Sequence, residues 1–336
     1  MRRGLGAARG LIVDAHLDIA WNALARGHPF QGAPAPGYLV SRDALSEAGV
    51  GLVLATIFCL PRGRRAGTEG LSYATPREAN LVAQGELGFY RSAGLELIRS
   101  RDELRAYTEG WHRGRLAAVC LMEGADPVEK PAQVGAWARS GVRIIGPAWS
   151  RTRYSGGTGA PGGLTELGVR LLRAMRRHRL ILDVSHLADR AVADVFDAWR
   201  GPIMASHSNA RALVPGDRQL TDATVAEIAR RGGVVGISFF RKHLRGDERP
   251  ATLDDVVAHV LHHARAAGGP EHVGLGTDLD GGFAGADSPL TSLAAINGLR
   301  PLLRRHFSAA QVDGIMGENW IEFLGRSLPE GKSAQA

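Results

Sequence analysis

Cysteine, lysine and long apolar runs are scarce in this 336-residue sequence, and each scarcity narrows the class of protein. The two cysteines, Cys59 and Cys120, stand inside apolar stretches, so we expect buried thiols and a cytoplasmic protein rather than a disulfide-bonded secreted domain. No run of about 18 apolar residues occurs, which argues against a transmembrane helix. The basic first ten residues lack the apolar segment of a signal peptide, so we expect no secretory leader.

Positive charge is in excess, with a formal net charge of +7, and arginine carries most of it because only three residues are lysines. A nucleic-acid binder is one interpretation of such a charge. The basic residues are spread along the chain, however, without a recognition module or interleaved aromatic residues. We therefore favour a scattered arginine surface, expect neither a nucleic-acid nor a membrane partner, and retain a modest bias toward anionic substrates.

Eight short apolar runs, mostly alternating with helical segments, dominate the chain. The expected strands are residues 11–18, 50–58, 116–123, 142–149, 180–187, 202–208, 233–240 and 272–280. The expected helices are residues 76–93, 164–178, 188–199, a segment after Thr221, and residues 252–267, 290–305 and 308–327. Such alternation demands a parallel sheet, and eight such units close into a (β/α)8 TIM barrel of the α/β class.

The barrel is expected to be a single domain over residues 1–336, with loop insertions and a core of about residues 11–326, because no linker, repeat or composition break divides the chain. A doubly wound open sheet is the structural alternative. Its Gly-x-Gly-x-x-Gly signature does not follow the first strand. Residues 62–70 suggest a flexible charged insertion, and the glycine-rich residues 155–163 a mobile active-site loop.

Side chains that can bind a metal stand at the ends of the apolar runs, and the carboxyl ends of barrel strands converge on one site. Read in order, these strand ends carry His16, Asp18, Glu123, Trp149, His186, His207 and Asp278. Five of them are plausible metal ligands, too many for one catalytic zinc and suited to two ions that share a carboxylate. Imidazole and carboxylate ligands suit Zn²⁺, with Mn²⁺ or Co²⁺ as substitutes.

Two assignments around this site depend on position alone. None of the three lysines ends a strand, so within this set Glu123 is the only candidate for a bridging ligand. His259 and His263 are spaced i, i+4 on a predicted helix and could chelate a metal. Because that helix belongs to the outer ring of the barrel, we assign both histidines a surface role instead.

The sequence resembles the membrane (renal) dipeptidase family and its bacterial relatives, within the metal-dependent amidohydrolase superfamily. The resemblance spans about residues 11–326. The matching segments are Asp14-Ala-His-Leu-Asp18, Met122-Glu-Gly124, Asp183-Val-Ser-His186, Ala205-Ser-His-Ser-Asn-Ala-Arg211, Gly232-Gly-Val-Val-Gly236, Gly276-Thr-Asp-Leu-Asp-Gly281 and Gly317-Glu-Asn-Trp320.

The resemblance implies a zinc-dependent dipeptidase, often dimeric, that cleaves dipeptides including those with a C-terminal D-residue. By motif, His16 and Asp18 would bind one zinc, His186 and His207 the other, and Glu123 would bridge the two. Asp278 would be the catalytic acid and base that serves a metal-activated water. Arg218 would hold the carboxylate of the substrate.

Two departures from the family pattern affect the substrate rather than the metals. Trp149 stands where the animal enzymes have a substrate-contacting histidine, and a tryptophan donates only through its indole N–H. Gln219 follows Arg218, where the family usually has asparagine. We therefore keep two alternatives: hydrolysis of another small amide or lactone at the same site, such as an N-acyl amino acid or a cyclic amide, and a non-catalytic metal-binding protein.

Replacing Glu123 by glutamine is expected to lower both the metal content and the turnover, because a neutral amide is a poorer bridging ligand than a carboxylate. Elemental analysis and a dipeptide hydrolysis assay of the Glu123→Gln variant measure the two effects. An unchanged zinc stoichiometry and rate would contradict the bridging assignment.

Overall fold

Eight parallel strands form the centre of the computed structural model, which describes residues 10–63 and 71–331. They are β1 (Ile12–Leu17), β2 (Val50–Phe58), β6 (Ala117–Glu123), β7 (Val142–Gly146), β10 (Ile181–Asp183), β11 (Ile203–Met204), β12 (Val235–Ile237) and β13 (Val273–Leu275). The spatial order is β11-β10-β7-β6-β2-β1-β13-β12. A parallel bridge between Ala205 and Val235 brings the two ends together, so the barrel is nearly closed and the predicted fold class is confirmed.

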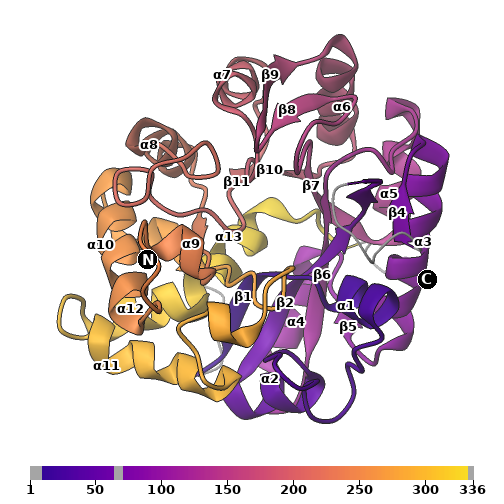
Figure 1. Cartoon of the computed structure of the whole chain (residues 1–336). Coiled ribbons are helices and arrows are strands. Elements are labelled where there is room, and N and C mark those ends of the chain that lie inside the picture. The colour runs from indigo at the N-terminus through magenta and orange to yellow at the C-terminus, as the bar shows by residue number, and fades with distance from the viewer. Residues whose placement is uncertain (1–9, 64–70, 332–336) are drawn as a thin grey trace.

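Helices surround the strands as an outer ring (Figure 1). They are α1 (Ile19–Arg26), α2 (Arg42–Ala48), α3 (Pro76–Ser92), α4 (Arg101–Glu109), α5 (Val134–Ser140), α6 (Glu166–Arg177), α7 (Asp189–Ala198), α8 (Asp222–Arg230), α9 (Arg241–Leu244), α10 (Leu253–Ala267), α11 (Leu299–Leu303), α12 (Ala309–Asp313) and α13 (Asn319–Ser327). The short strands β3 (Leu60–Pro61), β4 (Ser72–Tyr73) and β5 (Glu96–Leu97) lie between β2 and β6 in the chain. In the part of the chain that the structure describes, no helix has the length and apolar character needed to cross a bilayer.

The sequences of the strands are apolar almost throughout because both faces of each strand are buried. Alternate residues such as Val13, Leu52 and Val119 point into the barrel, where they belong to one apolar cluster with Trp320 of α13. Their neighbours pack outward against the helices in a second cluster. Trp320 donates its indole N–H to the carbonyl of Leu275 (2.9 Å) and fills one end of the barrel. Both cysteines are buried in the outer cluster, as predicted.

The structure corrects several boundaries. Strands β10 to β13 have only two or three residues each, because the chain leaves the ladder soon after it enters the barrel. The predicted mobile loop at 155–163 is instead a hairpin of β8 (Ser155–Gly157) and β9 (Ala160–Leu164), which packs on α7 (Figure 1). The predicted insertion at 62–70 lies mostly outside the described residues.

The two predicted C-terminal helices are interrupted. The first opens as a 3-10 turn (Leu293–Gly298), and α11 begins only at Leu299. This start places Pro301 in the first turn of α11, where its missing N–H is tolerated. The second predicted helix contains a π turn (Gly314–Glu318) between α12 and α13.

Two glycines allow the barrel to pack closely beside β11. A Cβ added to Gly236 would lie 1.9 Å from the carbonyl oxygen of Ser206, and one added to Gly276 would lie 1.8 Å from the same atom. This oxygen is a backbone atom, which cannot move aside as a flexible side chain could. The strands β12 and β13 can therefore approach Ser206 only with glycine at these positions.

Replacing Gly276 by alanine is expected to lower the free energy of unfolding by about 3 kcal/mol, because the added methyl group overlaps the backbone of the barrel. Urea denaturation measures this change. Gly88→Ala is the matched control, since a Cβ there meets nothing within 4 Å. The control is expected to gain up to about 1 kcal/mol from helix propensity. Equal effects of the two substitutions would contradict the packing argument.

Candidate metal centre and substrate pocket

The residues predicted to bind metal converge at the carboxyl ends of the strands. His16 lies in β1, Asp18 is the first residue after that strand, and Glu123 is the last residue of β6. His186, His207 and Asp278 stand three residues beyond the ends of β10, β11 and β13, on the loops rather than within the strands. Two sets have ligand atoms close enough to hold one ion each, and both contain His16: His16, Glu123 and His207; and His16, Asp18 and Asp278.

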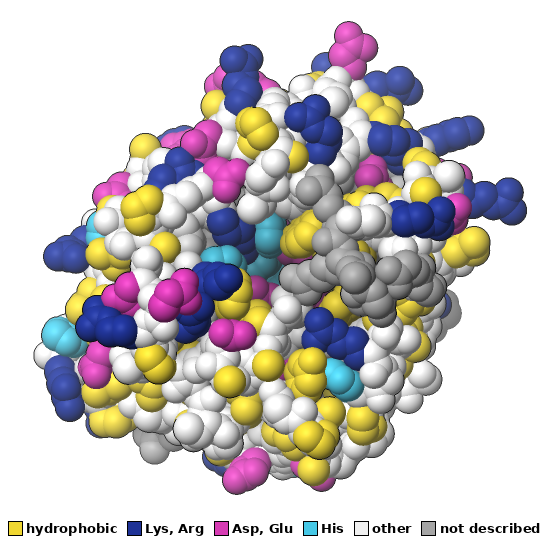
Figure 2. All heavy atoms as spheres, in the orientation of Figure 1, with side chains coloured by type: hydrophobic (Ala, Val, Ile, Leu, Met, Phe, Trp, Pro, Cys, Tyr) yellow, Lys and Arg dark blue, Asp and Glu magenta, His cyan; other side chains and the backbone are white. Residues whose placement is uncertain are grey.

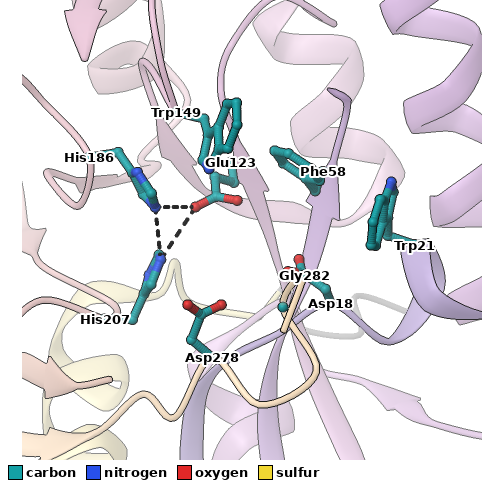
Figure 3. A pocket seen from close by; sticks show the side chains of 10 residues that line it. Asp18, Trp21, Phe58, Glu123, Trp149, His186, His207, Asp278 and Gly282 are labelled. Atoms are coloured by element: carbon teal, nitrogen blue, oxygen red, sulfur yellow. Dashed lines mark hydrogen bonds and ion pairs between the residues drawn. The ribbon is translucent and has the colours of Figure 1, made fainter. Parts of the chain in front are cut away.

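His186 completes the convergence. Its Nε2 lies 3.0 Å from Nε2 of His207 and 3.1 Å from Oε1 of Glu123, and the His207 nitrogen lies 3.4 Å from the same oxygen (Figure 3). Nε2 of His16 is 3.8 Å from Oε1 of Glu123. The structure thus brings all five predicted ligands and Asp278 into one centre.

Hydrogen bonds on the far sides of two imidazoles determine which nitrogen faces the centre. Ser206 Oγ donates its proton to Asp183 (2.6 Å) and accepts from Nδ1 of His207 (2.7 Å). Thr158 Oγ1, in the turn of the β8–β9 hairpin, contacts Nδ1 of His186 at 3.0 Å. With Nδ1 of each ring protonated, each Nε2 directs a lone pair at Glu123.

This arrangement fits a bound cation. Burial lowers the pKa of His16 to about 3, and burial with the positive charge of Arg218 lowers the pKa of His186 well below its ordinary value. Burial, with His16 and Arg218, does the same for His207. The rings are therefore neutral, and their acceptor nitrogens face one another and the carboxyl group of Glu123. Nε2 of His16 is buried without a hydrogen-bond partner among the described residues.

The charges of the buried carboxyl groups also favour a bound cation. Burial, followed by the charges of Asp18 and Asp278, raises the pKa of Glu123 well above its usual range. Three carboxyl groups thus share one buried space, and the positive charge of Arg218 offsets part of their repulsion. A divalent cation would offset the rest and favour the ionised form of Glu123. The donor set of imidazole and carboxylate groups is suited to Zn²⁺ and similar ions.

Two further aspartates, to which the sequence analysis gave no role, support the ligands. Asp14 accepts from the backbone N–H of Thr277 (2.8 Å) and of His16 (3.2 Å), and thereby ties β1 to β13. Asp183 accepts from the N–H of Ser206 (2.9 Å) and ties β10 to β11. Burial raises the pKa of Asp14 to about 6. A carboxylate inside an otherwise apolar strand, two or three residues before a histidine, was the available sequence signal.

The structure contradicts the surface role predicted for His259 and His263. Both lie on α10, but their rings face inward and are fully buried. His259 accepts from the N–H of Ala210 at 3.1 Å, and His263 donates to the carbonyl of Ser208 at 3.0 Å. They hold the backbone that follows His207. The outer position of a helix therefore did not imply an outward side chain.

A pocket opens to solvent above the centre (Figure 2). Its lining combines Asp18, Glu123, His186, His207 and Asp278 with Trp21, Phe58, Trp149, Gly281 and Gly282. The three aromatic rings form a wall, with Phe58 in edge contact with Trp21 (5.9 Å) and Trp149 (5.3 Å). Figure 3 shows the two histidines on the opposite side of the pocket from Phe58 and Trp21. Trp149, the residue predicted to govern the choice of substrate, therefore lines the pocket.

The backbone at the centre is held in an unusual conformation. Of the four non-glycine residues with positive φ in the described ranges, His186 (68°), Asp278 (59°) and Asp280 (61°) lie at or beside the pocket. Left-handed conformations at such residues are maintained only where surrounding contacts enforce them. Gly281 makes room for the Asp278 carboxylate, because a Cβ there would lie 2.0 Å from its Oδ1.

Arg218, predicted to hold the substrate carboxylate, lies behind His207 rather than among the residues that line the pocket. Its Nη atoms donate to the His207 carbonyl (2.5 Å) and to Ser208 Oγ (3.0 Å). Its Nε is buried without a partner among the described residues. Donors therefore remain on a buried guanidinium whose charge acts on Asp278 and Glu123.

The barrel and this centre together define a metal-dependent enzyme of the amidohydrolase class. The sequence matches the profile of the membrane dipeptidase family (peptidase family M19) over residues 7–327, so the chain belongs to that family. A dipeptidase of Claviceps purpurea is 28% identical over 299 residues, which are 85% of this chain and 68% of that protein.

Solved structures agree with this assignment. A metallopeptidase of Rhodobacter sphaeroides, liganded with a phosphinate mimic of the dipeptide L-Ala-D-Ala, has a TM-score of 0.82 and 25% identity, over 94% of this chain and 99% of its own. The M19 dipeptidase AC has a TM-score of 0.81 and 26% identity, over 95% of this chain and 98% of its own. The predicted family and enzyme class are confirmed, and the enzyme is a metallo-dipeptidase of family M19.

The buried histidines of α10 predict how stability depends on pH. Burial lowers the pKa of both His259 and His263 to about 4, against about 6.5 for an unfolded histidine. Between these values the unfolded chain binds protons that the folded protein does not, so stability is lost as the pH falls from 6.5 toward 4. Each histidine contributes a slope of about 1.4 kcal/mol per pH unit.

Urea denaturation of the metal-free protein at pH 7, 6 and 5 measures this slope. His263→Gln, whose amide can still donate to the Ser208 carbonyl, is expected to decline less steeply than the unsubstituted protein. His112→Gln is the control, because that ring is exposed. Identical slopes for the two variants would show that His263 is not neutral in the folded state.

Proposed function

We propose that this protein hydrolyses dipeptides, including L,D-dipeptides, at a centre of two zinc ions. The single observation that carries the proposal is the convergence of the neutral His186 and His207 nitrogens on Oε1 of Glu123, at 3.1 and 3.4 Å. His16 and Asp18 would hold one ion, His186 and His207 the other, and Glu123 would bridge them. Mn²⁺ or Co²⁺ could replace zinc with the same ligand types.

The metals would supply a water of lowered pKa and a polarised scissile carbonyl. The residues of the chain supply the rest. Asp278, held above the centre with its carboxylate in the pocket, accepts the proton of the attacking water and returns it to the leaving amine. Arg218, buried behind His207, attracts the substrate carboxylate by its positive charge and thereby favours one orientation of the dipeptide. The Trp149–Phe58–Trp21 wall excludes water from the side chain that packs on it.

The choice of dipeptides as substrates rests on the relatives. The Rhodobacter sphaeroides metallopeptidase carries a mimic of L-Ala-D-Ala, which supports a preference that includes a C-terminal D-residue.

The experiment is a metal titration of the chelator-stripped protein against a substrate panel. Activity on L,D- and L,L-dipeptides is expected to be absent without metal, and to saturate at two equivalents of Zn²⁺. Asp18→Asn is expected to lower the bound metal from two ions toward one and to reduce kcat/KM by at least about 100-fold, because a ligand and its charge are lost.

His112→Asn serves as the matched control. The side chain of His112 is exposed, and the residue precedes the amino end of β6, whereas the site lies at the carboxyl ends of the strands. Lactones and N-acyl amino acids complete the panel. Saturation at one equivalent would reject the two-ion centre. Faster turnover of a lactone or an N-acyl amino acid than of any dipeptide would reject the proposed substrate class.

A further inference from the structure

The end of strand β2 extends beyond its neighbour β1. Leu17, the last residue of β1, pairs with Ala55, whereas β2 continues to Phe58. On its other side, β2 stays paired with β6 to the end, where Phe58 stands opposite Glu123. The β1 side of β2 therefore has no strand partner over its last three residues, directly beside the metal centre. A buried strand edge needs other hydrogen-bond partners there.

Two side chains of α3 meet this need. Glu86 accepts from the backbone N–H of Phe58 through Oε2 at 2.7 Å. Tyr90, one helical turn later, donates its hydroxyl to the carbonyl of Thr56 at 2.7 Å and accepts from the N–H of Ala20 at 3.1 Å. Both side chains are fully buried. The i, i+4 spacing places them along one face of the helix, in the line that β1 would have occupied.

The groups they hold belong to one side of the pocket. Phe58 is part of the aromatic wall, and Ala20 lies in the first turn of α1, between Asp18 and Trp21. Figure 3 shows Asp18, Trp21 and Phe58 together on the side away from His186 and His207. The mechanism described above uses neither Glu86 nor Tyr90, although both are polar and buried.

The interaction of Glu86 does not need a negative charge. Burial raises the pKa of its carboxyl group well above the usual range, and the charge of Asp18 raises it further. Oε1 has no hydrogen-bond partner among the described residues. Glutamine keeps one carbonyl oxygen in the place of Oε2 and can therefore still accept from the Phe58 N–H.

We propose that Glu86 and Tyr90 are positioning residues that replace β1 along the end of β2 and thereby fix the Asp18 side of the substrate pocket. The inference rests on the proposed function for its kinetic readout only. Its structural readout, the protection of the Phe58 and Ala20 amides, is independent of activity.

The test compares Glu86→Leu, Glu86→Gln and Tyr90→Phe in the full-length, metal-loaded enzyme. The matched control is Tyr107→Phe, because Tyr107 is equally buried and donates to a β2 carbonyl, that of Gly51, at the opposite end of the strand. Hydrogen exchange at Phe58 and Ala20 is measured together with kcat and KM for an apolar dipeptide.

Glu86→Leu is expected to accelerate exchange at Phe58, and Tyr90→Phe at Ala20, each by at least about tenfold, because a buried amide loses its acceptor. Both are expected to raise KM roughly five- to tenfold with a smaller change in kcat. Glu86→Gln restores exchange and KM to nearly the original values. Tyr107→Phe lowers the melting temperature without changing either quantity.

The proposal is overturned if Glu86→Leu and Tyr90→Phe behave like Tyr107→Phe, with lower stability alone. It is also overturned if Glu86→Gln is as impaired as Glu86→Leu, because the acceptor would then not be what matters. If the unsubstituted enzyme cleaves no dipeptide, the proposed function fails, and amide exchange still decides the positioning role.

Discussion

Three buried acceptor atoms that face one another form the constraint on which the rest of the site depends. The Nε2 atoms of His186 and His207 and Oε1 of Glu123 lie within 3.0–3.4 Å of one another, an arrangement that is repulsive unless a proton or a metal ion stands between them. The surrounding structure resists this repulsion. Asp183 fixes the chain before His207, and His263 fixes the backbone after it. The hydrogen bonds of the fold thus hold these ligand atoms close together.

The architecture was predictable because burial on both faces leaves a direct trace in sequence. A strand covered on both faces is apolar throughout, and eight such runs separated by helices admit few topologies. The same logic fails at strand ends. Residues 184–187 and 205–208 were predicted to continue the strands because they directly follow apolar runs, yet the chain has already left the ladder. Periodicity cannot distinguish a strand from a buried loop held by an aspartate inside it, as Asp183 holds Ser185 and Ser206.

The candidate site was predictable as a set of residues but not as a set of interactions. Histidines and carboxylates that follow apolar runs converge in any parallel barrel, which is why all the predicted ligands meet. Thr158 could not be foreseen in the same way, since its contact with His186 depends on a hairpin that composition alone suggests to be loose. His259 and His263 were misplaced for a related reason. A helix of the outer ring also has a face toward the barrel. The residue pattern of one helix does not show that His259 and His263 lie on that face and contact the loop after His207.

The closing contacts of the barrel have a consequence for synthesis. Asp14 accepts hydrogen bonds from Thr277, 263 residues further along the chain, and β1 shares an apolar cluster with Trp320. On the ribosome, β1 is therefore made long before these partners. Contacts of such long sequence separation slow folding and leave a window for aggregation. The active centre needs β1 and β13 together, so it forms only after both strands have been synthesised.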